Sequence, residues 1–224
     1  MAYRRTENVV RRLAARHEAI VSAARATAAE GGMAAVQIAP VADRAGIAAG
    51  TVYRYFPSKT DLVAELVAAS SEREIDAMRR AATAAPGPLS ALAAAIATFA
   101  ARALYQHRLS WALIGEPVDA ESDAARLPFR RALAAEIEGR VRAAISSGHL
   151  PEQDAALAAP ALVGALLEGL VGPLARPAAN DPAKARAVVQ MLTLLTLRAV
   201  GVVDARARGV VLQTALPATE IGLT

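Results

Sequence analysis

The 224-residue chain is long enough for one large domain or two smaller ones. Its residues are 54% hydrophobic but only 4% aromatic, and many of them are alanine, a composition typical of an all-α protein. It contains no cysteine, which excludes disulfides and cysteine-based metal sites. Nine of the 25 Lys and Arg residues but only four of the 21 Asp and Glu residues lie in the first 60 positions, so this segment either faces a polyanion or carries a solubilising basic surface.

Neither the first residues nor the most apolar stretch is typical of a targeting or membrane segment. The first residues are basic but lack the continuous apolar block of a secretory signal. The stretch 155–175 is interrupted by Pro160, Glu168 and Pro173, whereas a transmembrane helix needs about 20 predominantly apolar residues. We therefore expect a soluble, cytoplasmic protein without membrane contact.

The first 84 residues predict an arm followed by four helices. These elements are a flexible basic arm at 1–10 and helices at about 9–30, 38–45, 49–55 and 58–84. Gly31 and Gly32 end the first helix, and Gly46 separates the two short ones. Ser58 and Asp61 form an S-x-x-D capping signal that opens the long fourth helix.

After a Pro-Gly turn at 85–88, the apolar pattern predicts a second set of helices. They are expected at about 89–107, 108–115, 122–147, 153–173 and 181–200. Pro160 should either kink the fourth of these or mark a late start. We divide the chain into domains at 1–60 and 61–205, followed by a tail at 206–224 whose structure the pattern does not specify.

Two short helices joined by a tight glycine turn are the minimum of a helix-turn-helix, and residues 38–55 have this form. Gly46 supplies the positive φ that a sharp turn demands, while Val52 and Phe56 are expected in the core. The other face of the second helix carries groups that can reach phosphates or base edges, namely Thr51, Tyr53, Arg54 and Tyr55. Lys59 adds a charge at the start of the next helix, a favourable place for a phosphate.

The run AGIAAGTVYRYFPSKTDLV, with AIVSAARATAAEGGMAAVQIAPVADR before it, closely resembles the DNA-binding domain of the tetracycline-repressor (TetR/AcrR) family over roughly residues 11–66. The resemblance implies an all-α fold, with an N-terminal three-helix helix-turn-helix domain and a C-terminal helical domain for ligand binding and dimerisation. It also implies contacts to double-stranded DNA. The matching positions are Thr51, Tyr53, Tyr55 and Lys59, mostly for the DNA backbone, and Ala49 and Gly50 for base edges.

Two departures from the family pattern affect how bases are read. Ala48 stands where the family usually has a Ser or Thr cap, whose loss typically costs about 1 kcal/mol. Ala49 and Gly50 offer no hydrogen-bonding side chain, so base readout would rest on methyl contacts, Tyr53, Arg54 and DNA shape.

Each of these assignments has a plainer alternative. Tyr53 could simply pack against its neighbours, and Arg54 could only face solvent. We hypothesise that Arg4 and Arg5 reach DNA as an arm, whereas the alternative is an unstructured tail without a function.

The last two helices, 153–173 and 181–200, are strongly apolar, and 181–200 should be mostly buried. The resemblance implies that they pair with their twins in a four-helix interface of a homodimer. The alternative is that they only form the core of the monomer.

A pocket for a small-molecule effector is expected among the helices at 89–147. The candidate lining residues are Phe99, Arg102, Trp111, Glu116 and Phe129. Trp111 is the strongest single candidate, because its ring is costly to expose and useful for binding. For each of them, a place in the core or on the surface is the alternative.

The leading functional hypothesis is a ligand-responsive repressor that leaves a pseudo-palindromic operator when a small molecule binds. The alternative within the same fold is a ligand-independent regulator or an activator. An enzyme is disfavoured, because the three histidines are far apart and no H-E-x-x-H, G-x-S-x-G or P-loop spacing occurs. We therefore expect no catalytic residues, no cofactor and no metal.

Overall fold

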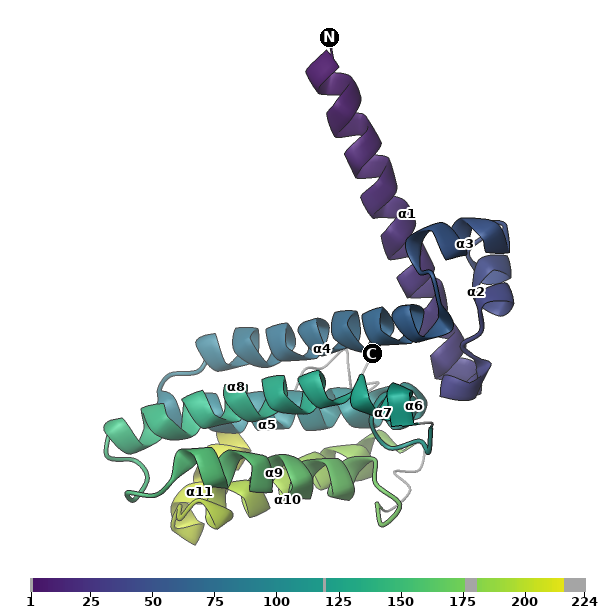
Figure 1. Cartoon of the computed structure of the whole chain (residues 1–224). Coiled ribbons are helices and arrows are strands. Elements are labelled where there is room, and N and C mark those ends of the chain that lie inside the picture. The colour runs from purple at the N-terminus through teal and green to yellow at the C-terminus, as the bar shows by residue number, and fades with distance from the viewer. Residues whose placement is uncertain (1, 119, 176–180, 216–224) are drawn as a thin grey trace.

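The computed structural model of the protein describes residues 2–118, 120–175 and 181–215, and every regular element in those ranges is helical. The elements are α1 (Ala2–Gly31), the 3-10 helix η1 (Met33–Ala35), α2 (Ile38–Arg44), α3 (Ala49–Tyr55), α4 (Lys59–Thr83), α5 (Pro88–Tyr105), α6 (His107–Ile114), α7 (Ala120–Ala124), α8 (Leu127–Ser146), α9 (Ala155–Leu170), α10 (Pro182–Ala199) and α11 (Asp204–Gln213). The all-α expectation is confirmed. We call residues 2–58 the head and residues 59–215 the body, and Figure 1 shows the head beside the start of α4, the first helix of the body.

The head is held together by a small core to which each of its helices contributes one apolar face. Ile20 and Ala24 of α1, Val41 of α2 and Val52 of α3 are all buried. Phe56, directly after α3, is buried as well and closes the core on the side of α4. The helix-turn-helix is thus packed against the second half of α1.

The first half of α1 projects beyond the head (Figure 1). The helix begins at Ala2 and continues to Gly31. The prediction of a flexible arm at 1–10 is therefore wrong, because residues 2–10 are helical. Alanine and arginine are strong helix formers, and neither glycine nor proline interrupts the chain before Gly31, which explains the continuous helix. The side chains of Arg4 and Arg5, which we hypothesise to reach DNA, lie outside the described side chains.

The body is built around α5, which contacts α4, α6, α8, α9, α10 and α11. Its side chains are mostly buried, including Ile96 and Phe99. By length and composition α5 could cross a membrane, but 72% of its apolar window is buried inside the fold, as expected for a core helix of a packed bundle. The apolar stretch that the sequence singled out, 155–175, contains the shorter helix α9.

The single helix expected at 122–147 is wrong, because the structure has two helices, α7 and α8, with a break at Arg126. The Arg126 side chain is only 4% exposed. It donates hydrogen bonds from Nη1 to the carbonyl of Glu116 at 2.8 Å and from Nη2 to the carbonyl of Ala112 at 2.7 Å. The chain turns here to place this guanidinium against the end of α6, and Pro128 suits the start of α8 that follows.

Part of the tail expected at 206–224 is helical. Ala207 and Val211 of α11 are buried, and α11 contacts α5 and α10. The domain limit drawn at residue 205 therefore falls inside a helix that belongs to the body, whereas 216–224 lies outside the described residues.

Candidate nucleic-acid interface and ligand groove

α3 has one buried face and one open face. Val52 is completely buried. On the other side Gly50, Tyr53 and Arg54 are exposed, Tyr53 to 52%, and Thr51 lies half-buried beside them. An open helix face with an aromatic ring, hydroxyl groups and a guanidinium can contact both phosphates and base edges of DNA.

Two glycines shape this surface. Gly46 has a φ of 65° and forms the turn between α2 and α3, where the Ile47 N–H donates to the Ala42 carbonyl at 3.0 Å. This confirms the positive φ expected at Gly46. At Gly50 nothing lies within 4 Å of the position that a Cβ would take, so the backbone of α3 is open to the close approach of another molecule. Ala49, at the start of α3, is half-buried.

The starts of α3 and α4 differ in capping. Ala48 caps α3 with an extended backbone and no side-chain hydrogen bond, as expected from the missing Ser or Thr. At α4 the Ser58 Oγ accepts from the Asp61 N–H at 3.1 Å, and Asp61 Oδ2 accepts from the Ser58 N–H at 3.0 Å, which confirms the capping box. Lys59 is the first residue of α4, where the helix dipole favours a nearby anion.

Tyr55 packs toward α1 rather than with the open face of α3. It is half-buried, and its ring centroid is 6.4 Å from that of His17, whose own centroid is 5.1 Å from that of Phe56. His17 Nε2 lies 3.6 Å from Oε1 of Glu65 in α4. All four residues line a cavity of about 740 Å³ between the head and the start of α8, so Tyr55 helps to join α1, α3 and α4.

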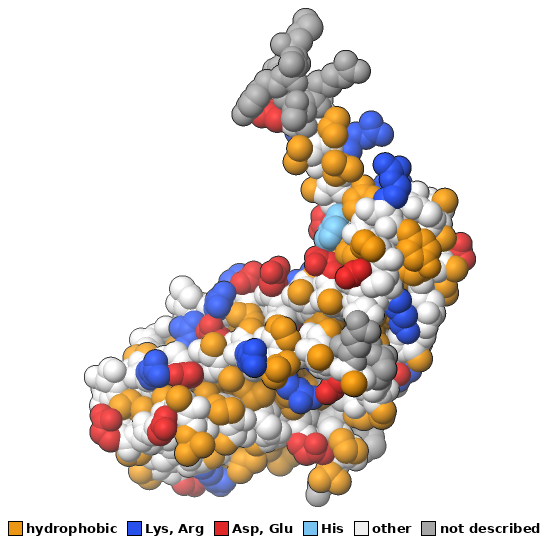
Figure 2. Space-filling model, viewed as in Figure 1, with side chains coloured by type: hydrophobic (Ala, Val, Ile, Leu, Met, Phe, Trp, Pro, Cys, Tyr) orange, Lys and Arg blue, Asp and Glu red, His pale blue; other side chains and the backbone are white. Residues whose placement is uncertain are grey.

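Basic side chains lie along the projecting part of α1 and on the head, where they are blue in Figure 2. Arg11, Arg12 and Arg16 are all exposed. Arg44, also exposed, instead pairs with Glu30. Most of the described positive charge of the head is thus at its surface.

Three of the five candidate ligand-binding residues lie in packed or paired positions. Phe99 is buried at the centre of α5. The Arg102 Nε donates to Oε2 of Glu74 at 2.6 Å. Trp111 is half-buried, and a Cβ on Gly115 would lie 2.6 Å from its ring, so the indole packs on bare glycine backbone.

The other two candidates line two different cavities. Phe129 is buried and lines the cavity that also contains Tyr55, whereas Glu116 lines a groove on another side of the body. Phe99, Arg102 and Trp111 line neither of these two spaces. Their role in ligand binding stays a prediction. Within the described ranges, no three His, Asp or Glu side chains are grouped so that they could hold a metal ion.

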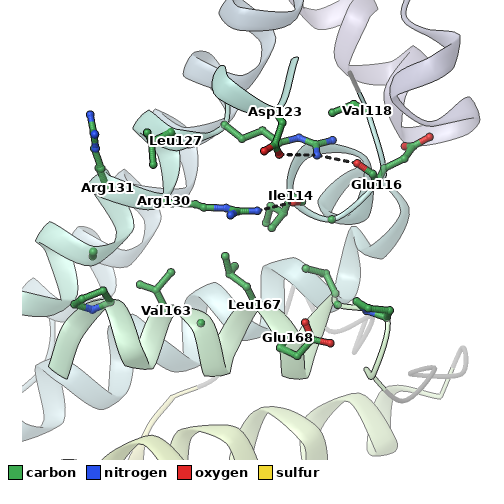
Figure 3. A pocket seen from close by; sticks show the side chains of 18 of the residues that line it. Ile114, Glu116, Val118, Asp123, Leu127, Arg130, Arg131, Val163, Leu167 and Glu168 are labelled. Atoms are coloured by element: carbon green, nitrogen blue, oxygen red, sulfur yellow. Dashed lines mark hydrogen bonds and ion pairs between the residues drawn. The ribbon is translucent and has the colours of Figure 1, made fainter. Parts of the chain in front are cut away.

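The groove that Glu116 lines has a volume of about 750 Å³ and lies between the turn after α6, the start of α8, and α9 (Figure 3). Its apolar lining consists of Ile114, Val118, Leu127, Val163, Leu167 and Val171. This volume is within the range of small-molecule sites. Sequence reasoning missed the groove, because its walls come from three segments that only the folded bundle brings together.

Three arginines, Arg126, Arg130 and Arg131, line the groove. Arg126 is buried, and its Nη1 lies 3.6 Å from Oδ1 of Asp123, while burial lowers the pKa of its guanidinium. Arg130 reaches across the groove in Figure 3, and its Nη2 donates a long hydrogen bond of 3.3 Å to the carbonyl of Ile114.

Glu116 connects the groove to the head. Its Oε2 accepts a hydrogen bond from the Met33 N–H at 2.8 Å, while its backbone carbonyl is held by Arg126. Gly32 has a φ of 80°, and a Cβ there would lie 2.7 Å from the Glu116 carboxylate and 2.6 Å from Arg108 Nη2. Since Gly32 and Met33 lie between α1 and α2, this contact joins the turn after α6 to the chain that leads into the helix-turn-helix.

α9 and α10 present large apolar side chains to solvent. Leu157 of α9 is 70% exposed, and Met191 and Leu195 of α10 are 59% and 54% exposed. Figure 2 shows hydrophobic side chains (orange) spread over the lower part of the body. The expectation that 181–200 is mostly buried is therefore wrong for the single chain, because one side of α10 is open. The late start considered for α9 is also wrong, since the helix begins at Ala155, before Pro160.

Comparison with known proteins identifies relatives that match part of the chain. A family model described as bacterial regulatory proteins, tetR family, matches residues 20–66. The HTH-type transcriptional repressor KstR of Rhodococcus jostii is 48% identical over 58 residues, which are 26% of this chain and 27% of that repressor. KstR of Mycobacterium tuberculosis is 45% identical over 78 residues, 34% of this chain and 35% of that protein. The matched segment thus spans between about a quarter and about a third of the length of these relatives.

Solved structures match nearly the whole chain in fold. RolR in complex with resorcinol has a TM-score of 0.68 at 22% identity, covering 93% of this chain and 98% of RolR. The regulator FadR from Bacillus subtilis in complex with stearoyl-CoA has a TM-score of 0.66 at 20% identity, covering 83% of this chain and 98% of FadR. The overall helical fold is therefore shared with these two proteins.

Proposed function

Because this chain belongs to the tetR family of bacterial regulatory proteins, we propose that it is a DNA-binding transcriptional regulator, namely a repressor that a small molecule releases from a pseudo-palindromic operator. The observation that carries the proposal is the open face of α3, with Gly50, Tyr53 and Arg54 exposed inside the stretch that matches the family model. A regulator of this kind works in the cytoplasm, where bacterial DNA lies.

In the proposed complex α3 enters the major groove, which is wide enough for an α-helix. The bare backbone at Gly50 allows the helix to come close to base edges, and Tyr53 and Arg54 supply a hydroxyl group and a guanidinium. Thr51 and Lys59 contact phosphates, Lys59 from the first turn of α4. Tyr55 supports α3 through its packing on α1.

A homodimer is part of the proposal, because a pseudo-palindrome is read by two recognition helices about 34–36 Å apart. The exposed apolar faces of α9 and α10 support a four-helix interface between two copies. Leu157, Met191 and Leu195 would be buried there, which removes a hydrophobic surface that a monomer would leave in water.

Release by a small molecule requires a ligand site and a connection from that site to the head. The groove between α8 and α9 favours a ligand-responsive regulator over a ligand-independent one, since a fully packed body would leave no such space. The contact of Glu116 with Met33 supplies the connection. A ligand that shifts the turn after α6 would move the start of the helix-turn-helix and change the spacing of the two recognition helices.

The test measures, by fluorescence anisotropy, how tightly the full-length protein binds the DNA upstream of its own reading frame. Affinity should fall steeply with added salt, because each phosphate contact releases counterions. Tyr53→Ala and Lys59→Ala should each weaken binding by about tenfold, the effect of losing roughly 1–3 kcal/mol of contact. Arg208→Ala is the matched control: it removes an exposed cation of α11, far along the chain from the head, and should leave the affinity unchanged. Equal binding by wild type, Tyr53→Ala and Lys59→Ala, or a flat salt response, would refute the placement of α3.

A further inference from the structure

We infer that the groove between α8 and α9 binds an amphipathic small-molecule anion, with its charged group on Arg130 and its apolar part on Val163 and Leu167. This names the class of effector for the regulator proposed above, and its regulatory meaning rests on that proposed function. The groove could instead be covered by a second copy of the chain, an occupant that the experiment below distinguishes.

The apolar part of the ligand is inferred from the walls of the groove. Val163 and Leu167 point from α9 into the space below Arg130 in Figure 3, and Ile114 lies beside the guanidinium. Leu127, at the start of α8, adds an exposed apolar side chain to the opposite wall. Covering these side chains gains roughly 25 cal/mol for each Å² of apolar surface removed from water, which favours a hydrophobic ligand body.

The sign of the ligand's charge is inferred from the carboxylates around the groove, each of which already has a partner within the protein. Asp123 lies 3.6 Å from the buried Arg126, and Glu168 accepts a hydrogen bond from the Leu174 N–H at 3.0 Å. Glu116 points away from the groove in Figure 3, toward its hydrogen-bond partner in the head. These groups therefore offer little to a cationic ligand.

Arg130 is the group that a ligand anion would meet. In the part of the chain that the structure describes it forms no ion pair, and its Nη2 donates the long 3.3 Å hydrogen bond to the Ile114 carbonyl. A guanidinium has five N–H donors in a planar fork that matches a carboxylate, so most of its donors remain for a ligand. Arg131, the next residue, also lines the groove and is exposed. These two arginines indicate that the ligand is an anion.

The site is also placed to affect the head. An anion on Arg130 competes with the Ile114 carbonyl at the end of α6 for the same guanidinium. The turn that follows α6 carries Glu116, which is bonded to Met33. Ligand binding would therefore act on the segment that connects body and head.

The experiment is isothermal titration calorimetry of the full-length protein with sodium decanoate and 2-naphthoate. Decan-1-ol and 2-naphthol serve as uncharged matches, and acetate serves as the anion without an apolar body. At least one of the two amphipathic anions should bind about tenfold more tightly than its alcohol, because a charge-assisted hydrogen bond contributes about 1.5–3 kcal/mol. Acetate should show no measurable binding.

Arg130→Gln should reduce the affinity for the anion about tenfold or more, whereas Arg80→Gln, which removes an exposed cation of α4 that does not line the groove, should leave it within about twofold. Leu167→Glu, which places a carboxylate in the groove, should abolish binding. Circular dichroism shows whether each variant is folded. If Arg130→Gln misfolds, Arg130→Lys replaces it. This variant keeps the positive charge but loses the planar fork of donors, so it should still weaken binding of the anion.

Absence of binding by both anions, equal binding by the alcohols, or full affinity in Arg130→Gln would overturn the inference. So would a change of oligomeric state in Arg130→Gln without any ligand binding, which would assign the groove to an interface between copies. DNA binding is measured on the same samples. If DNA binds and the anions do not, only this inference fails; if the anions bind and DNA does not, only the regulator proposal fails.

Discussion

The head and the body differ in how far apart in the chain the residues of their proposed sites lie. In the head, the turn at Gly46, the open face of α3 and the capping box at Ser58 all fall within about twenty residues. In the body, the groove is built from segments that extend from Ile114 to Pro173 and meet only after folding. Accordingly the family model matches only residues 20–66, while the body shares its fold with regulators about 20% identical.

This difference has a physical cause in the partners that we propose. Every stretch of double-stranded DNA presents a similar phosphate backbone and a major groove of similar width, so a recognition helix works with few backbone geometries. Small-molecule effectors differ in shape and charge, and a helical bundle can vary its cavity without losing its packing. The head therefore resembles its relatives in local amino-acid sequence, whereas the body resembles them only in the arrangement of its helices.

The largest expected effect is on the core of the body, at Phe99. Phe99→Ala should lower the free energy of unfolding by about 3–5 kcal/mol, because the side chain is buried at the centre of α5 and its loss leaves a cavity. Urea unfolding followed by circular dichroism measures the change. Tyr105→Ala on the same helix, where the ring is exposed, is the control and should change stability by less than about 0.5 kcal/mol. A small loss at Phe99 would instead favour its earlier assignment to a ligand pocket.

The proposed dimer is tested on the open faces of the body. The double variant Met191→Glu and Leu195→Glu should dissociate the dimer, because four carboxylates would meet in an apolar interface. Analytical ultracentrifugation should then show a monomer, and affinity for a palindromic DNA should fall about 100-fold, or about 2.7 kcal/mol. Leu212 of α11 is apolar and even more exposed but lies outside α9 and α10, so Leu212→Glu should leave the dimer intact. A monomeric wild type would contradict the interface.

The connection between head and body is tested at Glu116. Glu116→Ala leaves the Met33 N–H without its partner and should destabilise the junction by about 1–3 kcal/mol. Hydrogen exchange of the Met33 amide should become faster, while amides in the core of α5 should not change. Glu116→Gln keeps an oxygen acceptor at the same place and should restore most of the protection. Unchanged exchange at Met33 in Glu116→Ala would show that the contact does not hold the head.

The smallest expected effect is a gain of stability in the head. Ala48→Ser should stabilise α3 by about 1 kcal/mol, because Ala48 is an N-cap with an extended backbone and no side-chain hydrogen bond. Thermal unfolding should show a slightly higher Tm. Ala84→Ser is the control, since Ala84 is exposed at the other end of a helix, where no N–H is left to cap. A higher Tm in both variants, or in neither, would contradict the role of the cap.

Prediction from sequence worked best where a local rule was sufficient. The glycine turn at Gly46, the uncapped start at Ala48 and the reciprocal cap of Ser58 and Asp61 are all present as expected. Each depends on a few neighbouring residues and a backbone geometry that those residue types favour. The two short helices of the head and most helices of the body were placed for the same reason.

The errors have a common origin in contacts between distant segments. The break between α7 and α8 exists because Arg126 is buried against the carbonyls of α6, and nothing near Arg126 in the sequence signals that contact. The groove was missed for the same reason, and of the five candidate ligand residues only Glu116 lines it. At α1 the opposite error occurred, because the basic composition suggested an arm although the residues are good helix formers.

Residue order alone was enough to establish the helical class, the helix-turn-helix and the side of α3 that is free for a partner, because helix periodicity and turn chemistry act over a few residues. Packing of the complete bundle was needed to show which cation faces an open groove, which carboxylate holds the head and which faces of α9 and α10 remain in water. Those properties depend on what each side chain meets across the fold, and the identity of that neighbour is not encoded within any short stretch of chain.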